Sequence, residues 1–158
     1  MISPTVSEIL KFAVRMEGVG ERFYRDIAFS ALDGSVKNLF NHLAGEEAKH
    51  KKIFEGLLTK IDTFTYPENY PVEYLEYFYY YLDKNIIFSD EKKDSLPEPS
   101  NMTNSFDLSM QLELDSVVLY QELKQFVSAE DNETIENVIN EERKHFIMLS
   151  ELKHKFAL

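Results

Sequence analysis

Two segments of the sequence carry a Glu and a His, three residues apart, at the centre of an otherwise apolar pattern. Glu47 and His50 interrupt one such pattern, and Glu142 and His145 interrupt the other. The apolar positions, spaced three and four residues apart, are Val36, Phe40, Leu43, Phe54, Leu57 and Ile61 in the first, and Ile135, Val138, Leu149, Leu152 and Phe156 in the second. This spacing keeps one helix face toward one partner. Because burying a carboxylate and an imidazole without partners is costly, the pattern predicts a compensating metal ion.

An internal repeat brings two further carboxylates into the pattern. A spacing of 95 positions relates Glu47 to Glu142 and His50 to His145. A spacing of 96 positions relates an upstream segment to a downstream one, and the matched pairs are Leu10 with Phe106, Glu17 with Glu113, and Tyr24 with Tyr120. Two copies of one helical hairpin would pack about a pseudo-twofold axis. We therefore expect the repeated polar residues to converge at the centre.

The expected set contains one Glu from each of two helices and Glu-x-x-His from each of two others. That arrangement is the ligand set of di-iron and di-manganese carboxylate proteins. Residues i and i+3 share a helix face at about 5–6 Å, so a Glu and a His can reach one ion or two adjacent ions. Bridging carboxylates suit metals about 3.5–4 Å apart. Oxygen and imidazole ligands without thiolate fit a pair of Fe or Mn ions, and also Zn.

Four long helices are expected to position these residues in one all-α domain, 1–158, built as a four-helix bundle. Ser3 is the expected cap of the first helix, with Pro4 in its first turn, and Asp33-Gly34 is the expected turn that follows. A long crossover with a short aromatic helix, Val72–Leu82, would let the second and third helices run parallel. The first hairpin, 4–60, is expected to contain helices at about 4–31 and 35–60, and the crossover is expected at about 62–102. The second hairpin, 103–157, is expected to contain helices at about 103–127 and 128–157.

Composition excludes several classes of function. The net charge is −11 and no basic patch is present, so neither nucleic acid nor an anionic membrane is an expected partner. The absence of Cys excludes disulfides, zinc–thiolate sites, iron–sulfur clusters and cysteine catalysis. No apolar run is long enough to span a bilayer, and charges at Glu8 and Lys11 argue against a secretory signal. A cytoplasmic protein is expected.

Some positions have competing interpretations. A single buried Glu–His pair is often a structural hydrogen bond, but two equivalent pairs with matching upstream Glu residues favour a metal site. Glu21 lies one turn after Glu17, yet its repeat equivalent is Val117, so Glu17 is the preferred ligand. Tyr24 and Tyr120 fit either ordinary core aromatics or hydrogen-bonding groups beside the site. Four polar residues fall off the apolar pattern and are expected on the surface: His42, Glu46, Glu141 and His154.

At these residues the chain resembles the rubrerythrin-like branch of the ferritin-like superfamily. The matching segments are Glu17–Tyr24, Glu46–His50, Glu113–Tyr120 and Glu141–His145. The resemblance implies a ferritin-like four-helix bundle and a non-haem di-iron centre that reacts with hydrogen peroxide or dioxygen. It implies bridging roles for Glu47 and Glu142, and terminal roles for Glu17, Glu113, His50 and His145. Tyr24 and Tyr120 would orient carboxylates or donate protons.

The sequence departs from full-length rubrerythrins in two ways. Without Cys it has no rubredoxin-like iron domain, so a redox function would require a separate electron-donor protein. It also lacks an additional Glu on the third helix, where Asp115 and Ser116 stand, so metal binding is more strongly implied than efficient peroxidase activity. Three functions fit: a peroxide- or dioxygen-reducing enzyme, an iron-handling ferroxidase or storage protein, and a non-redox metal-binding module. The aromatic crossover and the repeated hairpins favour a homodimer over a storage cage.

Overall fold

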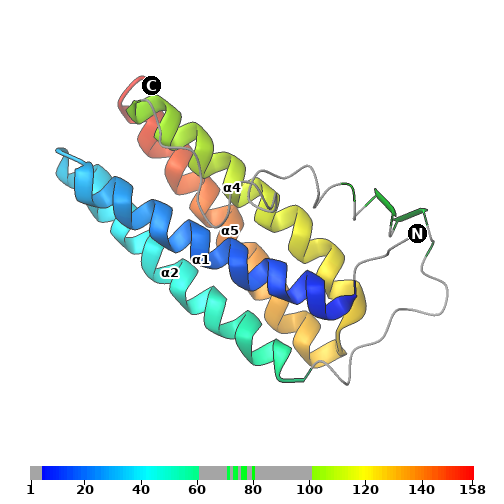
Figure 1. Cartoon of the computed structure of the whole chain (residues 1–158). Coiled ribbons are helices and arrows are strands. Elements are labelled where there is room, and N and C mark those ends of the chain that lie inside the picture. Colours follow the sequence, from blue (N-terminus) through cyan, green and yellow to red (C-terminus); the bar gives the residue numbers. More distant parts are fainter. Residues whose placement is uncertain (1–4, 61–70, 72, 75, 78–79, 81–100) are drawn as a thin grey trace.

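The computed structural model of the chain is a bundle of four long helices (Figure 1). The structure describes residues 5–60, 71, 73–74, 76–77, 80 and 101–158. The expected all-α bundle is confirmed, and helix is the only regular structure in those ranges. The elements are α1 (Val6–Ser30), α2 (Gly34–Leu58), α4 (Met102–Leu123), the short 3-10 helix η3 (Lys124–Phe126) and α5 (Ala129–Lys155).

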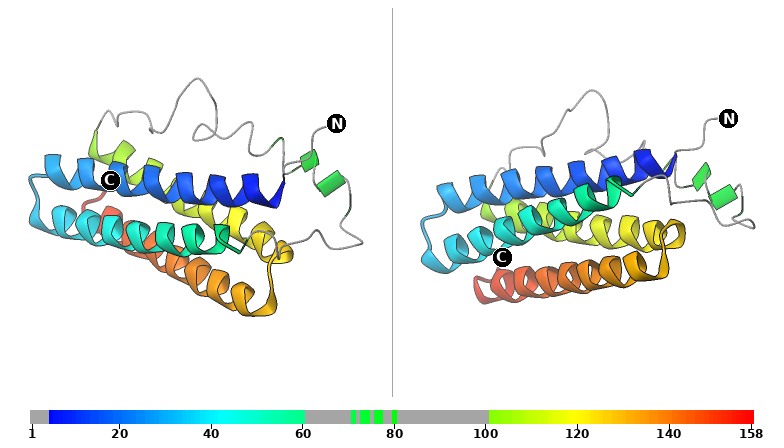
Figure 2. Two further views of the ribbon diagram at one scale, coloured as in Figure 1. Left: turned by 60° about the horizontal axis from the view of Figure 1, so that its bottom comes forward. Right: turned by 90° about the horizontal axis from the view of Figure 1, so that it is seen from below.

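The bundle consists of two antiparallel hairpins, α1–α2 and α4–α5. Figures 1 and 2 show that α2 and α4 run in the same direction, as a long connection between them requires. Nearly all of the expected crossover, 62–102, lies outside the described residues. Within the expected aromatic helix, the described residues 73–74, 76–77 and 80 have helical backbone.

The first helix begins at a different cap from the expected one. Thr5, and not Ser3, caps α1: its hydroxyl accepts a hydrogen bond from the Glu8 backbone N–H at 3.2 Å. The Glu8 carboxylate accepts in turn from the Thr5 backbone N–H at 2.7 Å. This reciprocal capping box satisfies two N–H groups that the helix leaves unpaired, which explains why the helix starts at Val6 rather than near Pro4.

Side-chain caps also set the starts of the other helices. Asp33, expected to belong to a turn, caps α2 by accepting hydrogen bonds from the backbone N–H groups of Ser35 and Val36. Asn101 caps α4, and Ser128 caps α5. These caps fix where each helix begins, and the apolar stripe of each helix decides which face packs inward.

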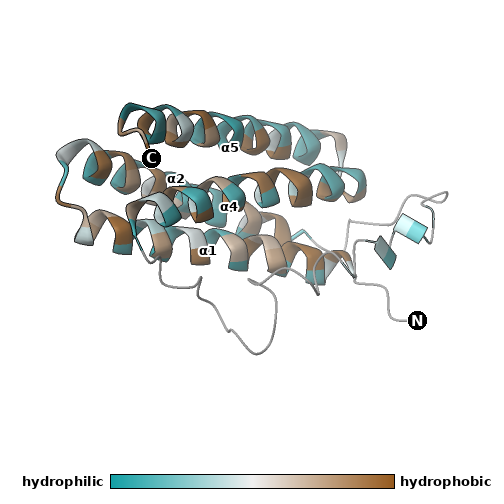
Figure 3. Cartoon of the chain, turned by 90° about the horizontal axis from the view of Figure 1, so that it is seen from above, coloured by the Kyte–Doolittle hydropathy of each residue, from teal (hydrophilic) through white to brown (hydrophobic). Residues whose placement is uncertain are grey.

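The buried faces form an apolar core that is interrupted by a polar layer. Figure 3 shows hydrophobic and hydrophilic residues alternating along each helix, as expected for helices with one buried face. Aromatic contacts join the hairpins. The rings of Phe40 and Phe106 meet edge to face with centroids 5.4 Å apart, and the ring centroids of Phe54 and Tyr120 are 4.5 Å apart. Among the described helices, none has the length and apolarity needed to cross a membrane.

Candidate metal centre

The structure brings all six expected ligands together in the middle of the bundle. Each is at most 2% exposed, and they come from all four long helices: Glu17 from α1, Glu47 and His50 from α2, Glu113 from α4, and Glu142 and His145 from α5. Their donor atoms form two groups, within each of which all atoms lie within 4.8 Å of one another. One group is Glu17, Glu47, His50 and Glu142, and the other is Glu47, Glu113, Glu142 and His145. Glu47 and Glu142 belong to both.

Glu142 lies between the two imidazoles and uses one oxygen for each. His50 donates through Nδ1 to Glu142 Oε1 at 3.0 Å, and His145 donates through Nδ1 to Glu142 Oε2 at 3.0 Å. The two rings are stacked, with centroids 5.7 Å apart. His145 Nδ1 is also 3.5 Å from Glu113 Oε2 and 3.6 Å from Glu47 Oε1. Both Nδ1 atoms therefore face the carboxylates at the centre.

Each buried tyrosine bonds to a carboxylate of the other hairpin. The Tyr24 hydroxyl in α1 donates to Glu113 Oε1 in α4 at 2.5 Å. The Tyr120 hydroxyl in α4 donates to Glu17 Oε1 in α1. Each Tyr follows a Glu by seven residues, two turns along the same face, and the antiparallel pairing of α1 with α4 brings it to the Glu of the other copy. The bonds fix one oxygen of each carboxylate and leave the second free to face the centre.

Three buried carboxylate oxygens have no hydrogen-bond partner within the described part of the chain. They are Glu17 Oε2, Glu47 Oε1 and Glu113 Oε2, and all belong to expected ligands. Unpaired buried polar atoms are uncommon because each loses its hydration without replacement. A set of carboxylate oxygens and imidazole nitrogens suits divalent Fe, Mn or Zn. The residues present therefore fit two metal ions, with Glu47 and Glu142 placed to contact both.

Comparison with known proteins agrees with this geometry. The family model described as Rubrerythrin matches residues 8–153. The chain belongs to the rubrerythrin family. Among solved structures it is similar to a protein of Thermotoga maritima described as a ferritin-like diiron-carboxylate protein, with 27% identity, a TM-score of 0.68, and coverage of 98% of this chain and 97% of that one. No curated protein matches the chain.

In this rubrerythrin-family chain, protons balance the buried charge of the metal-free centre. Burial opposes protonation of the imidazoles, but hydrogen bonds from the imidazoles to neighbouring carboxylates outweigh it and raise the pKa of His50 to about 9 and that of His145 to about 12. Burial, with the charges of Glu47 and Glu142, raises the pKa of Glu17 and Glu113 well above the usual range. Burial would also raise the pKa of Glu142, but hydrogen bonds from His145 and His50 lower it. Metal ions would replace these protons.

Glu141 has the partly exposed side chain that the sequence pattern predicts, at 45%, but it also contacts the candidate centre. It was expected to face solvent, yet its Oε2 accepts a hydrogen bond from His50 Nε2 at 2.7 Å. Glu46, expected on the surface too, has a side chain only 18% exposed and pairs with Lys49. A usable signal was present: a second Glu immediately precedes both Glu-x-x-His motifs.

The remaining competitors for ligand roles point elsewhere. Glu21 pairs with Arg25 at 2.8 Å, whereas Glu17 is fully buried. Buried Ser116 donates to the Met16 sulfur at 3.2 Å, and Asp115 accepts from Gln111. The position one turn after Glu113, which the resemblance associates with an additional Glu, thus presents a hydroxyl group.

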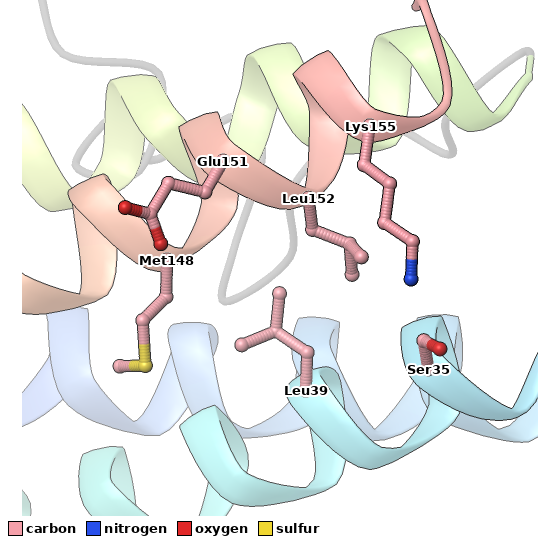
Figure 4. A pocket seen from close by; sticks show the side chains of 6 residues that line it. All are labelled: Ser35, Leu39, Met148, Glu151, Leu152 and Lys155. Atoms are coloured by element: carbon pink, nitrogen blue, oxygen red, sulfur yellow. The ribbon is translucent and has the colours of Figure 1, made fainter.

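A groove of about 300 Å³ lies between α2 and α5, beyond the centre (Figure 4). Its lining is Ser35, Leu39, Met148, Glu151, Leu152 and Lys155, and Figure 4 shows Leu39 and Leu152 pointing toward each other across it. None of the six expected ligands lines it. Of the lining residues, Met148 is nearest in sequence to an expected ligand, since it lies one turn after His145.

Gly20 leaves space for the Glu47 carboxylate, and we predict that Gly20→Ala weakens metal binding. An added Cβ would lie 3.0 Å from Glu47 Oε2 and 3.2 Å from Leu112 Cδ2, so the carboxylate would have to shift by a few tenths of an ångström. We expect a loss of affinity of about tenfold, equivalent to about 1.4 kcal/mol. Competition titration with a chelator measures it. Gly45→Ala is the matched control, because no atom lies within 4 Å of its added Cβ. Equal affinity in both variants would contradict the crowding argument.

Proposed function

We propose that this protein is a di-iron oxidoreductase that reduces hydrogen peroxide or dioxygen and takes its electrons from a separate donor protein. The observation that carries the proposal is the sharing of Glu47 and Glu142 between the two ligand groups. Shared carboxylates suit a pair of adjacent ions, whereas a lone structural ion would need only one group. Membership of the rubrerythrin family supports iron as the metal.

Two bound ferrous ions would supply two electrons, which with two protons reduce one hydrogen peroxide to two waters. The chain's own residues would prepare this reaction. His50 and His145 would hold one ion each, and Glu17 and Glu113 would complete the two positions. Tyr24 and Tyr120 keep those two carboxylates oriented, and their hydroxyl groups are the nearest neutral proton carriers bonded to the centre. The apolar residues around this layer exclude bulk water from it.

A separate electron donor is part of the proposal because this sequence supplies no thiolate-bound iron. It contains no Cys, and the carboxylate–imidazole groups are the clusters of potential metal ligands found in the described residues. The chain would therefore have to receive two electrons from a partner for each peroxide that it reduces. We further propose that the chain works as a homodimer.

The decisive experiment is metal analysis of protein purified without oxygen, followed by peroxide titration. We expect about two irons per chain, oxidised by about one peroxide per pair. An assembly with many irons per chain on size exclusion would point instead to iron storage. Stoichiometric zinc with no response to peroxide would indicate a non-redox metal-binding module. Either of these results overturns the oxidoreductase proposal.

A further inference from the structure

The two halves of the centre are related by the repeat but differ at the outer edge of the site. Glu46 and Glu141 are 95 positions apart, and each immediately precedes a Glu-x-x-His motif. Glu141 Oε2 lies 2.7 Å from His50 Nε2. Glu46 Oε1 instead lies 2.5 Å from Lys49 Nζ, on the next turn of its own helix. The pseudo-twofold symmetry is therefore broken at the outer edge of the site.

This contact fixes both nitrogens of the His50 ring. Nδ1 faces Glu142 at 3.0 Å, and Nε2 is bonded to Glu141. For His145, within the described residues, the structure records hydrogen bonding at Nδ1 only. When a metal binds Nδ1, the ring proton stays on Nε2. A carboxylate there fixes the tautomer and the ring orientation and makes Nδ1 a stronger donor.

Glu141 is well placed for this role because it is only half-buried. Its side chain is 45% exposed, while the His50 side chain that it contacts is 1% exposed. The carboxylate therefore keeps part of its hydration, and it contacts the outer nitrogen of His50 instead of the central ligand groups. It reaches His50 across the α2–α5 boundary, so it also links the second hairpin to the first.

From these contacts we propose that Glu141 is a positioning residue that makes the two metal positions unequal. The position formed by Glu17, Glu47, His50 and Glu142 binds a divalent cation more tightly than the one containing His145. The proposal rests on the metal centre proposed above. An alternative is a third cation site formed by Glu46, His50 and Glu141, whose donor atoms lie within 4.8 Å of one another. That reading requires Nε2 to lose the proton that it donates to Glu141.

Titration of the metal-free full chain with Co²⁺, followed by visible absorption, tests the proposal. The wild type should bind two equivalents in two resolved steps. Glu141→Ala should weaken the tighter step by about 10- to 100-fold, as loss of such a supporting carboxylate typically does, so that the steps merge. Glu46→Ala is the matched control from the other half of the repeat and should keep them resolved. Glu141→Gln retains an acceptor for the Nε2 proton and should restore most of the affinity.

A second readout follows the proton itself. In Zn²⁺-loaded protein, the NMR signal of the His50 Nε2 proton should be observable in the wild type and in Glu141→Gln. Exchange with water should remove it in Glu141→Ala. This signal reports the bond to Glu141 independently of affinity and of catalysis, and the conservative variant carries the test if the Ala variant folds poorly.

Each result decides the question. Two Co²⁺ ions bound identically in the wild type and in Glu141→Ala would overturn this inference and leave the metal centre intact. Equal losses of Co²⁺ affinity in Glu46→Ala and Glu141→Ala would overturn the proposal that Glu141 makes the two metal positions unequal. A third equivalent lost in either variant would replace the positioning role with a cation site. Absence of Co²⁺ binding by the intact chain would overturn both this inference and the proposed function.

Discussion

Glu47→Gln and Glu142→Gln are each expected to reduce metal loading from about two ions per chain to less than one. Both carboxylates belong to both ligand groups, so each loss removes an oxygen donor from the two positions at once. An amide is a poor substitute because it is neutral and offers a single oxygen. Metal analysis after anaerobic loading measures the stoichiometry, and peroxide-dependent oxidation should disappear with it. The double variant Glu47→Ala, Glu142→Ala should bind no metal ion.

The two variants should differ sharply in the metal-free state. Hydrogen bonds from both imidazoles lower the pKa of Glu142, so this carboxylate is the anion that balances them. In Glu142→Gln, the amide would turn its NH₂ group toward one imidazolium. Breaking a buried pair of a carboxylate and an imidazolium costs about 3–5 kcal/mol of the free energy of unfolding. Burial and the charge of Glu142 raise the pKa of Glu47, so Gln at position 47 should cost about 1 kcal/mol or less.

Chemical denaturation of the metal-free variants measures this difference. Glu21→Gln is the control for both readouts, since Glu21 lies one turn from Glu17 but pairs with Arg25 on the surface. It should leave loading and stability unchanged. Full loading of Glu47→Gln would show that this carboxylate is not shared by two ions. Equal stability of the two metal-free variants would contradict the charge assignment.

Periodicity could place the six central residues because each lies on the buried stripe of its own helix. Steps of three and four residues identified Glu47 and His50 as inward-facing without any knowledge of the partner helices. The repeat then supplied the matching residues of the other hairpin. The position of Glu17 relative to Glu21 followed from the same comparison, and the structure places Glu17 inside and Glu21 outside.

Contacts between side chains of different helices could not be predicted from periodicity. Tyr24 bonds to Glu113, and not to its own neighbour Glu17, because the antiparallel register of α1 and α4 decides which residues meet. Glu141 lies one residue off the buried stripe, but a long side chain can reach a neighbouring helix from the edge of its own. The Thr5–Glu8 capping box was legible in the sequence, yet Ser3 and Pro4 gave a competing signal just before it.

The metal-free protein is expected to lose stability as the pH rises from 6.5 to 9. In the folded state the pKa of His50 is raised to about 9 and that of His145 to about 12, against 6.5 as the ordinary value. A group whose pKa is raised by folding stabilises the folded state fully at pH values below its pKa in the unfolded chain. This contribution is lost as the pH rises toward its pKa in the folded chain. Each additional proton held by the folded state lowers the free energy of unfolding by about 1.4 kcal/mol per unit of pH increase.

The carboxylates determine the acidic side of the profile. Glu17 and Glu113 have raised pKa values, so their contribution also decreases as the pH rises above 4.5. Glu142 has a lowered pKa, so its contribution is present above 4.5 and is lost as the pH falls below that value. The stability of the metal-free chain should therefore be greatest near pH 4.5 and should already fall as the pH rises from there toward 6.5.

Metal binding should remove this trend. Bound ions replace the protons on the imidazoles and carboxylates, so the loaded chain has no imidazolium proton to lose between pH 6.5 and 9. Thermal unfolding with and without Zn²⁺ should show a gap that widens with pH, by several degrees per unit for a domain of this size. Calorimetric titration at pH 7 in buffers of different ionisation enthalpy should detect release of at least the two imidazolium protons. A metal-free melting temperature that rises across this range, or binding without proton release, would mean that protons do not hold the empty centre together.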